Sequence, residues 1–232
     1  HSEVKDHMFL DGLEDAYEEG KLMGSFAEDC AEKYQFTREA QDDYALRSLM
    51  RAREAQSSGA FENEITPLNL ARKKGDYAVA QDEQPLNAKP EKIPHLKPAF
   101  RVDGSVTAAN ASSISDGAAA LILSSQTHMQ QAGLLCRARI LGHASHAQEP
   151  AWFSTAPIFA TRKLLDRLNW RVKDVDLWEV NEAFAVVPMA FMTELDISGD
   201  IINVHGGACA LGHPIGASGA RIIVTLLHAM ER

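Results

Sequence analysis

The sequence predicts an α/β protein in which a layered core follows a mainly helical and irregular region. From residue 136 onward, short apolar segments of strand length alternate with longer helical segments, a pattern typical of α/β cores. Five of the nine prolines fall between residues 67 and 98, which indicates extended, irregular chain there. With 232 residues and 45% hydrophobic content, the chain has enough apolar material for one large or two small domains.

The helical and irregular part occupies residues 1–113. Thr37 is a suitable N-cap for a helix that ends near Gly59 and whose apolar stripe includes Ala45, Leu49 and Ala52. The proline-rich stretch that follows carries the densest positive charge of the chain, at Lys73, Lys74, Lys89, Lys92 and Lys97. These lysines form either a solvated loop or, for some of them, a contact surface for phosphate groups.

Residues 114–135 are predicted to form a strand, over 118–123, and then a helix. The alternating part of the chain follows. Its predicted elements are a strand over 137–142, a helix near 160–168, a strand over 175–180, a helix over 182–195, a strand over 200–204 and a helix over 217–230.

A glycine-rich loop at 203–219 holds the first candidate for chemistry, His213. Glycine allows a backbone to approach a ligand closely, and imidazole has the unperturbed pKa closest to neutrality. His213 is therefore a candidate general base, activator or oxyanion donor. The alternative is a structural histidine in a glycine-rich turn.

A second candidate, Asn181, follows the apolar strand predicted at 175–180. Functional side chains in α/β sheets gather where strands end, and an amide there can hold a water or a carbonyl oxygen. The alternative is that Asn181 is simply a helix N-cap.

Several segments together resemble the thiolases, specifically the acetyl-CoA acetyltransferase group. The most specific are Asn-Glu-Ala-Phe at 181–184, Gly-Gly-Ala at 206–208 and Gly-His-Pro-Ile-Gly-Ala-Ser-Gly at 212–219. Segments at 11–13, 22–24, 36–42, 96–100 and 106–120 agree in the same order. The resemblance covers essentially the whole chain.

The resemblance implies a partial thiolase-like α-β-α-β-α layered architecture with an inserted, mainly helical and irregular loop domain. Residues 1–113 would be the CoA-binding loop domain. Residues 114–135 would be the returning strand and helix of the N-terminal core domain. Residues 136–232 would be the C-terminal core domain without its last hairpin.

The resemblance also implies an acyltransferase that makes or cleaves 3-ketoacyl-CoA through an acyl-cysteine intermediate. His213 would activate the nucleophile and Asn181 would hold an oxyanion-hole water. Thiolases use two cysteines, but Cys30, Cys136 and Cys209 lack the motif context of either one and are interpreted as structural. We therefore expect an incomplete chain that is inactive alone and unfolds without a cooperative transition.

Eight residues match family positions that line the pantetheine tunnel. They are Leu13, Met23, Phe100, Ala108, Ser112, Phe153, Ala183 and Phe184. Read without the family, Met23 and Phe184 fit a core equally well, and Ser112 fits a turn. Leu22 stands where some acetoacetyl-CoA thiolases have histidine, which leaves the acyl preference open, and His205 replaces a common asparagine. Coenzyme A thioesters are expected as substrates, with no other cofactor and no metal.

Composition excludes several classes of protein. The net charge of −9 argues against a nucleic-acid-binding surface, and no apolar run reaches transmembrane length. We expect a cytoplasmic protein, with an organelle also open, that acts in fatty acid metabolism as a homodimer or homotetramer. The alternative is a catalytically inactive CoA-binding or oligomerising paralogue. A ketoacyl synthase is disfavoured because such enzymes carry histidine where Asn181 stands, and the glycines do not form a dinucleotide-binding motif.

Overall fold

The computed structural model describes residues 3–71 and 75–232. Its α-helices are α1 (Met23–Tyr34), α2 (Arg38–Ser57), α3 (Glu83–Asn87), α4 (Gln126–Gln131), α5 (Ala156–Leu168), α6 (Val186–Leu195), α7 (Ala208–Leu211) and α8 (Ile215–Met230). A π-helical turn lies at Phe9–Leu13, and 3₁₀ turns lie at Pro90–His95, Pro150–Thr155 and Val172–Asp174. The two strands are β1 (Leu68–Leu70) and β2 (Tyr77–Val79).

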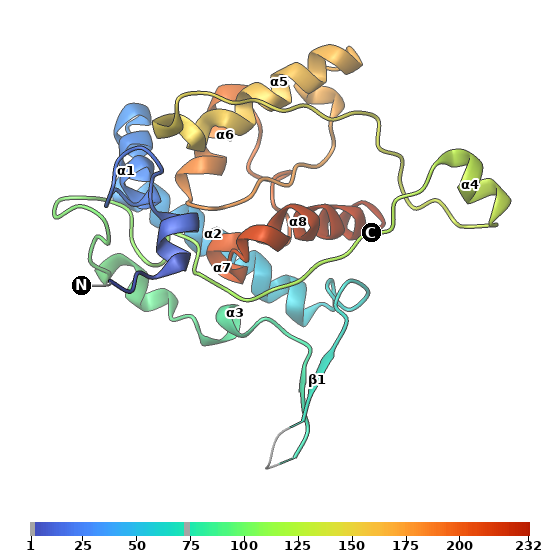
Figure 1. Cartoon of the computed structure of the whole chain (residues 1–232), viewed down its shortest axis with the longest axis horizontal. Coiled ribbons are helices and arrows are strands. Elements are labelled where there is room, and N and C mark those ends of the chain that lie inside the picture. The colour runs from blue at the N-terminus through green and yellow to red at the C-terminus, as the bar shows by residue number, and fades with distance from the viewer. Residues whose placement is uncertain (1–2, 72–74) are drawn as a thin grey trace.

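The predicted helix after Thr37 is confirmed as α2. The Thr37 hydroxyl oxygen accepts a hydrogen bond from the Ala40 N–H at 3.1 Å, which satisfies one of the free N–H groups of the first turn. The predicted stripe of Ala45, Leu49 and Ala52 is buried. Helix α2 therefore forms one wall of the molecule, and α7 packs against it (Figure 1).

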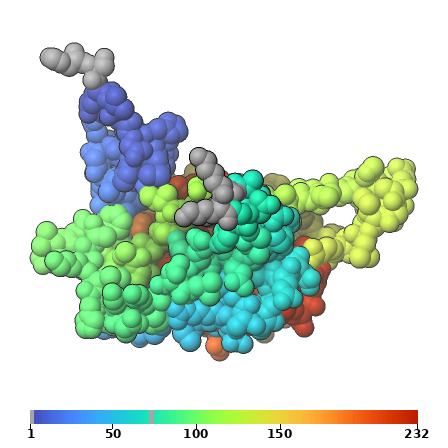
Figure 2. Space-filling model, turned by 90° about the horizontal axis from the view of Figure 1, so that it is seen from below, coloured from blue at the N-terminus to red at the C-terminus, as the bar shows by residue number. Residues whose placement is uncertain are grey.

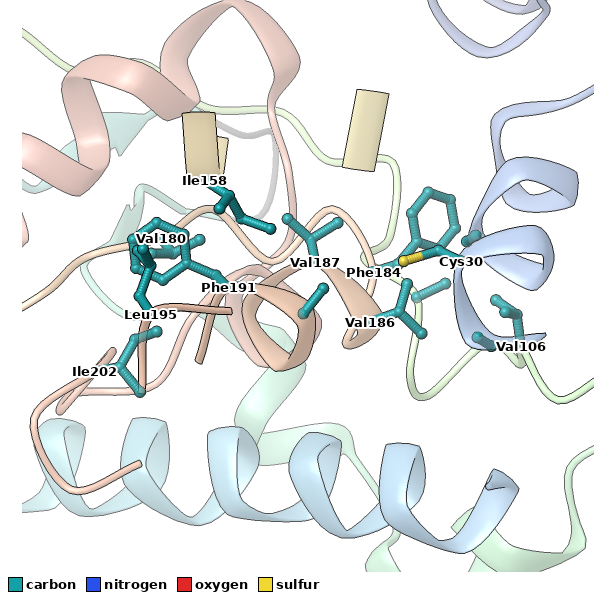
Figure 3. Close-up of a cluster of buried hydrophobic side chains, with 14 of the residues drawn as sticks. Cys30, Val106, Ile158, Val180, Phe184, Val186, Val187, Phe191, Leu195 and Ile202 are labelled. Carbon is teal, nitrogen blue, oxygen red and sulfur yellow. The ribbon is translucent and has the colours of Figure 1, made fainter. Parts of the chain in front are cut away.

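Helix α6 is the centre of the main core. Unlike an amphipathic surface helix, it is apolar around most of its circumference, so neighbouring elements must cover it on several sides. Figure 3 shows Val187 and Ile158 between two groups of side chains, one around Phe191 and Ile202 and the other around Phe184. Helices α1 and α5 both contact α6. This packing fixes the segment that precedes α6, which contains Asn181.

Helix α6 begins at Val186, four residues later than the predicted start at 182. The reason is that residues 183–185 pair with another segment and cannot also form a helical turn. The Ala185 N–H donates to the Asn110 carbonyl at 2.8 Å, and Ala111 and Phe184 form an antiparallel bridge. The predicted helices near 160–168 and over 217–230 are present as α5 and α8, with small changes of boundary.

The four predicted strands are not strands in the described part of the chain. Segments 118–123 and 137–142 are not helical and have no ladder partner there, and Ile122 is 95% exposed. Segments 175–180 and 200–204 lie side by side but share only one parallel bridge, Trp178–Ile202. Because a strand requires a hydrogen-bonded neighbour, apolar sequence alone does not produce one.

The observed sheet lies where irregular chain was predicted. Strands β1 and β2 pair antiparallel with Leu68 opposite Val79 and Leu70 opposite Tyr77. The pair projects from the body of the molecule in Figure 1. The segment around α4, drawn in yellow-green, also stands away from the body in Figure 2. No helix among the described residues combines the length and apolarity that a membrane crossing requires.

Candidate active site

The structure brings Asn181 and His213 together. Asn181 follows Val180 in the segment that leads into α6, and His213 lies between α7 and α8. The Asn181 Nδ2 and His213 Nε2 atoms are 3.3 Å apart. The two candidates, 32 residues apart in sequence, therefore form one polar pair.

A short hydrogen-bond chain orients the His213 ring. Its Nδ1 lies 2.6 Å from the Ser218 hydroxyl oxygen, and that hydroxyl donates to the Pro214 carbonyl at 3.1 Å. The hydroxyl makes both hydrogen bonds at once only when Nδ1 carries the proton that binds Ser218, and we assign this tautomer on that ground. Nε2 is then an acceptor, as the Asn181 amide N–H requires. This tautomer leaves Nε2 free of a proton in the resting state.

The surroundings of His213 keep its ring neutral. Burial lowers the pKa of His213, and the positive charge of Arg221 lowers it further. A neutral imidazole with an unprotonated Nε2 can accept a proton from a thiol. The arrangement is suited to general-base chemistry.

The loop before His213 is held against residues 113–115. The His213 N–H donates to the Ser113 carbonyl at 3.1 Å. Gly212 has a φ of +91°, and a Cβ there would overlap the Ser115 side chain. Glycine is thus required at this position for the two segments to meet.

An apolar cavity of about 430 Å³ opens next to this pair. Its wall includes His213 and seven of the eight residues matched to the tunnel: Leu13, Met23, Phe100, Ser112, Phe153, Ala183 and Phe184. Ala108 is exposed and lies outside this wall. The wall also contains residues to which sequence reasoning assigned no lining role, namely Met8, Phe9, Gly12, Gly24, Ala111, Ser113, Ile114 and Ile215. Leu22 also lines the cavity, so the wall is apolar at the position where some acetoacetyl-CoA thiolases have histidine.

Ser112 is tied to the wall by two hydrogen bonds. Its hydroxyl donates to the Ala183 carbonyl at 2.9 Å, and its backbone N–H donates to the same oxygen at 3.0 Å. The hydroxyl proton is therefore in use. The oxygen can still accept a hydrogen bond from an amide N–H placed in the cavity.

The three thiols differ in their surroundings. Burial raises the pKa of Cys30, which lies in the main core. Burial and the Glu182 carboxylate raise the pKa of Cys209 well above its usual value. Both thiols are therefore neutral and poorly nucleophilic at neutral pH. Cys136 is exposed, unlike the buried structural role expected for it. The described residues contain no group of three His, Cys, Asp or Glu side chains placed to hold a metal.

Comparison with protein families decides the identity of the fold. A family model of the thiolase N-terminal domain matches residues 1–127, and one of the thiolase C-terminal domain matches residues 134–232. The chain belongs to the thiolase family. Its structure is a partial thiolase-like α/β fold.

Thiolases of known name match the chain over almost its full length. A probable acetyl-CoA acetyltransferase of Dictyostelium discoideum is 48% identical over 97% of this chain and 55% of its own length. An acetyl-CoA acetyltransferase of Pseudomonas aeruginosa is 47% identical over 100% of this chain and 59% of its own. The chain thus spans less than two thirds of the length of these relatives.

Two solved thiolase structures agree closely with this fold. The acetyl-CoA acetyltransferase of Bacillus anthracis superposes with a TM-score of 0.94 at 42% identity, covering 100% of this chain and 59% of that one. The Acat5 thiolase of Ascaris suum, solved in complex with coenzyme A, gives 0.89 at 40% identity, covering 98% and 58%.

Glu179 is a buried carboxyl group in this thiolase chain that sequence reasoning missed. Neither of its carboxyl oxygens has a hydrogen-bond partner. Its pKa is raised from 4.5 to about 8, mainly by burial; Arg221 opposes the rise, and the Glu182 and Glu64 carboxylates add to it. A lone acidic residue within the apolar run at 177–180 is the sequence signal that identifies it.

Proposed function

We propose that the whole protein is an acetyl-CoA acetyltransferase that makes or cleaves 3-ketoacyl-CoA. In the synthetic direction two acetyl-CoA molecules would give acetoacetyl-CoA and CoA. The observation that carries this proposal is the Asn181–His213 pair at the wall of an apolar cavity in a thiolase chain. The named relatives, which are acetyl-CoA acetyltransferases, support the same reaction class.

His213 would act first as the base. Its unprotonated Nε2 would accept the proton of a cysteine thiol, whose thiolate then attacks the thioester carbonyl of acyl-CoA. The carbon–sulfur bond to CoA breaks, and the CoA thiolate takes the proton back from Nε2 as it leaves. While Nε2 carries that proton, it can donate to the oxyanion that develops on the carbonyl.

Asn181 would supply the second part of the oxyanion site. Its Oδ1 atom is buried without a partner and can accept a hydrogen bond from a water. That water would donate its other proton to the thioester oxygen or to the enolate of the second acetyl-CoA.

The acyl-accepting cysteine is assigned to the remainder of the whole protein. Cys30 and Cys209 are neutral thiols by reason of their raised pKa values, and Cys136 is separate from the cavity wall. The chain covers 55% to 59% of the length of its relatives, which is consistent with a nucleophile outside these residues.

The cavity would take the pantetheine arm of coenzyme A. Its mainly apolar wall suits the chain of methylene groups, and the Ser112 oxygen suits a pantetheine amide. The coenzyme A complex of the Ascaris suum thiolase supports this ligand. Lys89, Lys92 and Lys97 are exposed and available for phosphates, whereas Lys73 and Lys74 lie outside the described residues.

The resemblance also supports a homodimer or homotetramer that acts in fatty acid metabolism, in the cytoplasm or in an organelle. The loop and core domain boundaries at 113 and 135 belong to the same proposal. Light scattering of the purified whole protein tests the oligomeric state.

The test of the proposed reaction is thiolysis of acetoacetyl-CoA by CoA with the whole protein. We expect His213→Ala to abolish turnover and Asn181→Ala to lower it by roughly 10²–10³, the usual cost of an oxyanion donor. His143→Ala, at an exposed histidine that is not part of the cavity wall, is the matched control. Near-normal turnover by His213→Ala would overturn the assignment. Tight CoA binding without turnover by the natural protein would instead support the inactive paralogue.

A further inference from the structure

Glu182, the residue after Asn181, carries a fully buried carboxylate that accepts four hydrogen bonds. Its Oε1 accepts from the Tyr44 hydroxyl at 2.9 Å and from Asn203 Nδ2 at 2.9 Å. Its Oε2 accepts from the Ser48 hydroxyl at 2.7 Å and from the backbone N–H of Cys209 at 3.1 Å. All four donors are neutral groups, so the carboxylate is stabilised by hydrogen bonds rather than by an ion pair.

These donors come from two separate parts of the fold. Tyr44 and Ser48 lie on α2, whereas Asn203 and Cys209 lie in the segment that leads to His213. The Ser48 hydroxyl oxygen also accepts from the Gly207 N–H at 2.9 Å. A Cβ at Gly207 would overlap the Glu182 carboxylate, so the backbone approaches it as closely as sterics allow. Through these hydrogen bonds, Glu182 connects the loop before His213 to helix α2.

Asn203, in the same loop, is hydrogen-bonded to Val180, the residue before Asn181. Its Oδ1 accepts from the Val180 N–H at 2.8 Å, and its Nδ2 donates to the Val180 carbonyl at 2.8 Å. Its φ of +46° places it in the left-handed region that asparagine tolerates. Both neighbours of Asn181 are therefore bound to the loop that displays His213.

We propose that Glu182 is the positioning residue of the active site, whose carboxylate sets the Asn181 amide against the His213 imidazole. The proposal rests on the proposed function for its catalytic consequence. Glu182 itself does not line the cavity and would not touch the substrate. Its role is to hold two groups, which arrive from separate segments, at the 3.3 Å separation that the structure has.

The charge of the carboxylate is essential to this role. A glutamine at this position would replace one oxygen with an NH₂ group. If Oε2 is replaced, the Cys209 N–H faces another donor and cannot turn away, because it is part of the backbone. If Oε1 is replaced, Asn203 Nδ2 keeps the Val180 carbonyl but loses its acceptor on Glu182 and faces another donor there. In either orientation of the glutamine amide, one hydrogen bond between residue 182 and the loop is lost, although the side chain keeps its shape.

The test compares Glu182→Gln with Glu28→Gln in the whole protein. Glu28 is a matched control: it is also buried and accepts from three neutral donors, the Ser105 N–H, the Ser105 hydroxyl and the Val106 N–H. None of its hydrogen-bond partners is Asn181, His213 or a residue of the 203–213 segment. Both variants are measured by kcat and KM for acetyl-CoA per folded molecule, and by hydrogen exchange of the backbone amides at 203–213.

We expect Glu182→Gln to lower kcat by at least about tenfold, to change KM less than about threefold, and to accelerate exchange of the 203–213 amides. Glu28→Gln should leave both kcat and that exchange near the natural values. Equal kcat and equal exchange in the two variants would overturn the proposal and make Glu182 merely structural. If the natural protein shows no thiolase turnover, the proposed function fails, but faster exchange at 203–213 in Glu182→Gln alone still identifies the positioning contact.

Discussion

The substitution Glu179→Gln should make the protein more stable at neutral and alkaline pH. Both carboxyl oxygens of Glu179 are buried without hydrogen-bond partners. Burial raises the pKa from 4.5 to about 8, with smaller increases from Glu182 and Glu64 and an opposing effect of Arg221. Glutamine has the same shape and no charge to bury. The variant therefore removes a charged form that the folded state disfavours.

The size of the effect follows from the two pKa values. Well below pH 4.5 the carboxyl group is protonated in both the folded and the unfolded state, so its ionisation does not change the stability. Between 4.5 and about 8 only the unfolded state has released its proton, so stability falls as pH rises through this window. The pKa of the folded state (about 8) exceeds that of the unfolded state (4.5) by about 3.5 units. At about 1.4 kcal/mol per unit, the loss is about 3 kcal/mol at pH 7 and approaches about 5 kcal/mol above pH 8.

The assay is urea unfolding of the natural whole protein and of Glu179→Gln between pH 4 and pH 8.5. The difference between their unfolding free energies should be small below pH 5 and should grow in favour of the variant by about 2–4 kcal/mol at pH 7. Glu91→Gln, at an exposed glutamate, is the control and should show no such growth. Two parallel pH profiles for the natural protein and Glu179→Gln would refute the reasoning.

Three further predictions concern the site and the flanking segments. Ser218→Ala removes the acceptor of the His213 Nδ1 proton, so kcat should fall about tenfold with little change in KM; unchanged kcat would show that the tautomer is set elsewhere. Gly24→Ala places a Cβ into the Phe100 ring, so it should raise KM several-fold and lower the unfolding free energy by about 1–3 kcal/mol. Gly219→Ala is the control, because a Cβ there meets open space; the same kinetic and urea measurements should show neither effect. In the 232-residue chain expressed alone, amides of 118–123 and 137–142 should exchange at nearly unprotected rates, because these segments have no ladder partner among the described residues; strong protection would contradict this.

Sequence reasoning located the helices well because their signals are local. The Thr37 cap, the stripe of Ala45, Leu49 and Ala52, and the apolar run of α8 depend only on residues within a few turns. The predicted strands failed for the opposite reason. A strand is completed by a distant partner, and residues 118–123 find none in the described chain. The start of α6 moved for the same reason, since Ala185 bonds to Asn110 instead.

Motifs in the sequence pointed to individual residues of the candidate site, whereas the contacts between those residues became visible only in the structure. Asn181 and His213 were singled out separately, and the structure adds the distance between them. The carboxylate of Glu182 gave no sequence signal of its four donors, because Tyr44 lies 138 residues away along the chain. Ala108 was assigned to the tunnel by its motif; it is exposed and is not part of the cavity wall, and its role in substrate binding stays a prediction.

The most direct test of the central claim is transfer of an acetyl group from acetyl-CoA to the whole protein, followed by intact mass and CoA release in a single turnover. The account predicts that the natural protein gains one acetyl group per chain and releases one CoA, that His143→Ala does the same, and that His213→Ala gains none in that time. A natural protein that binds acetyl-CoA but is never acetylated, or a His213→Ala variant that is acetylated at the natural rate, would contradict it.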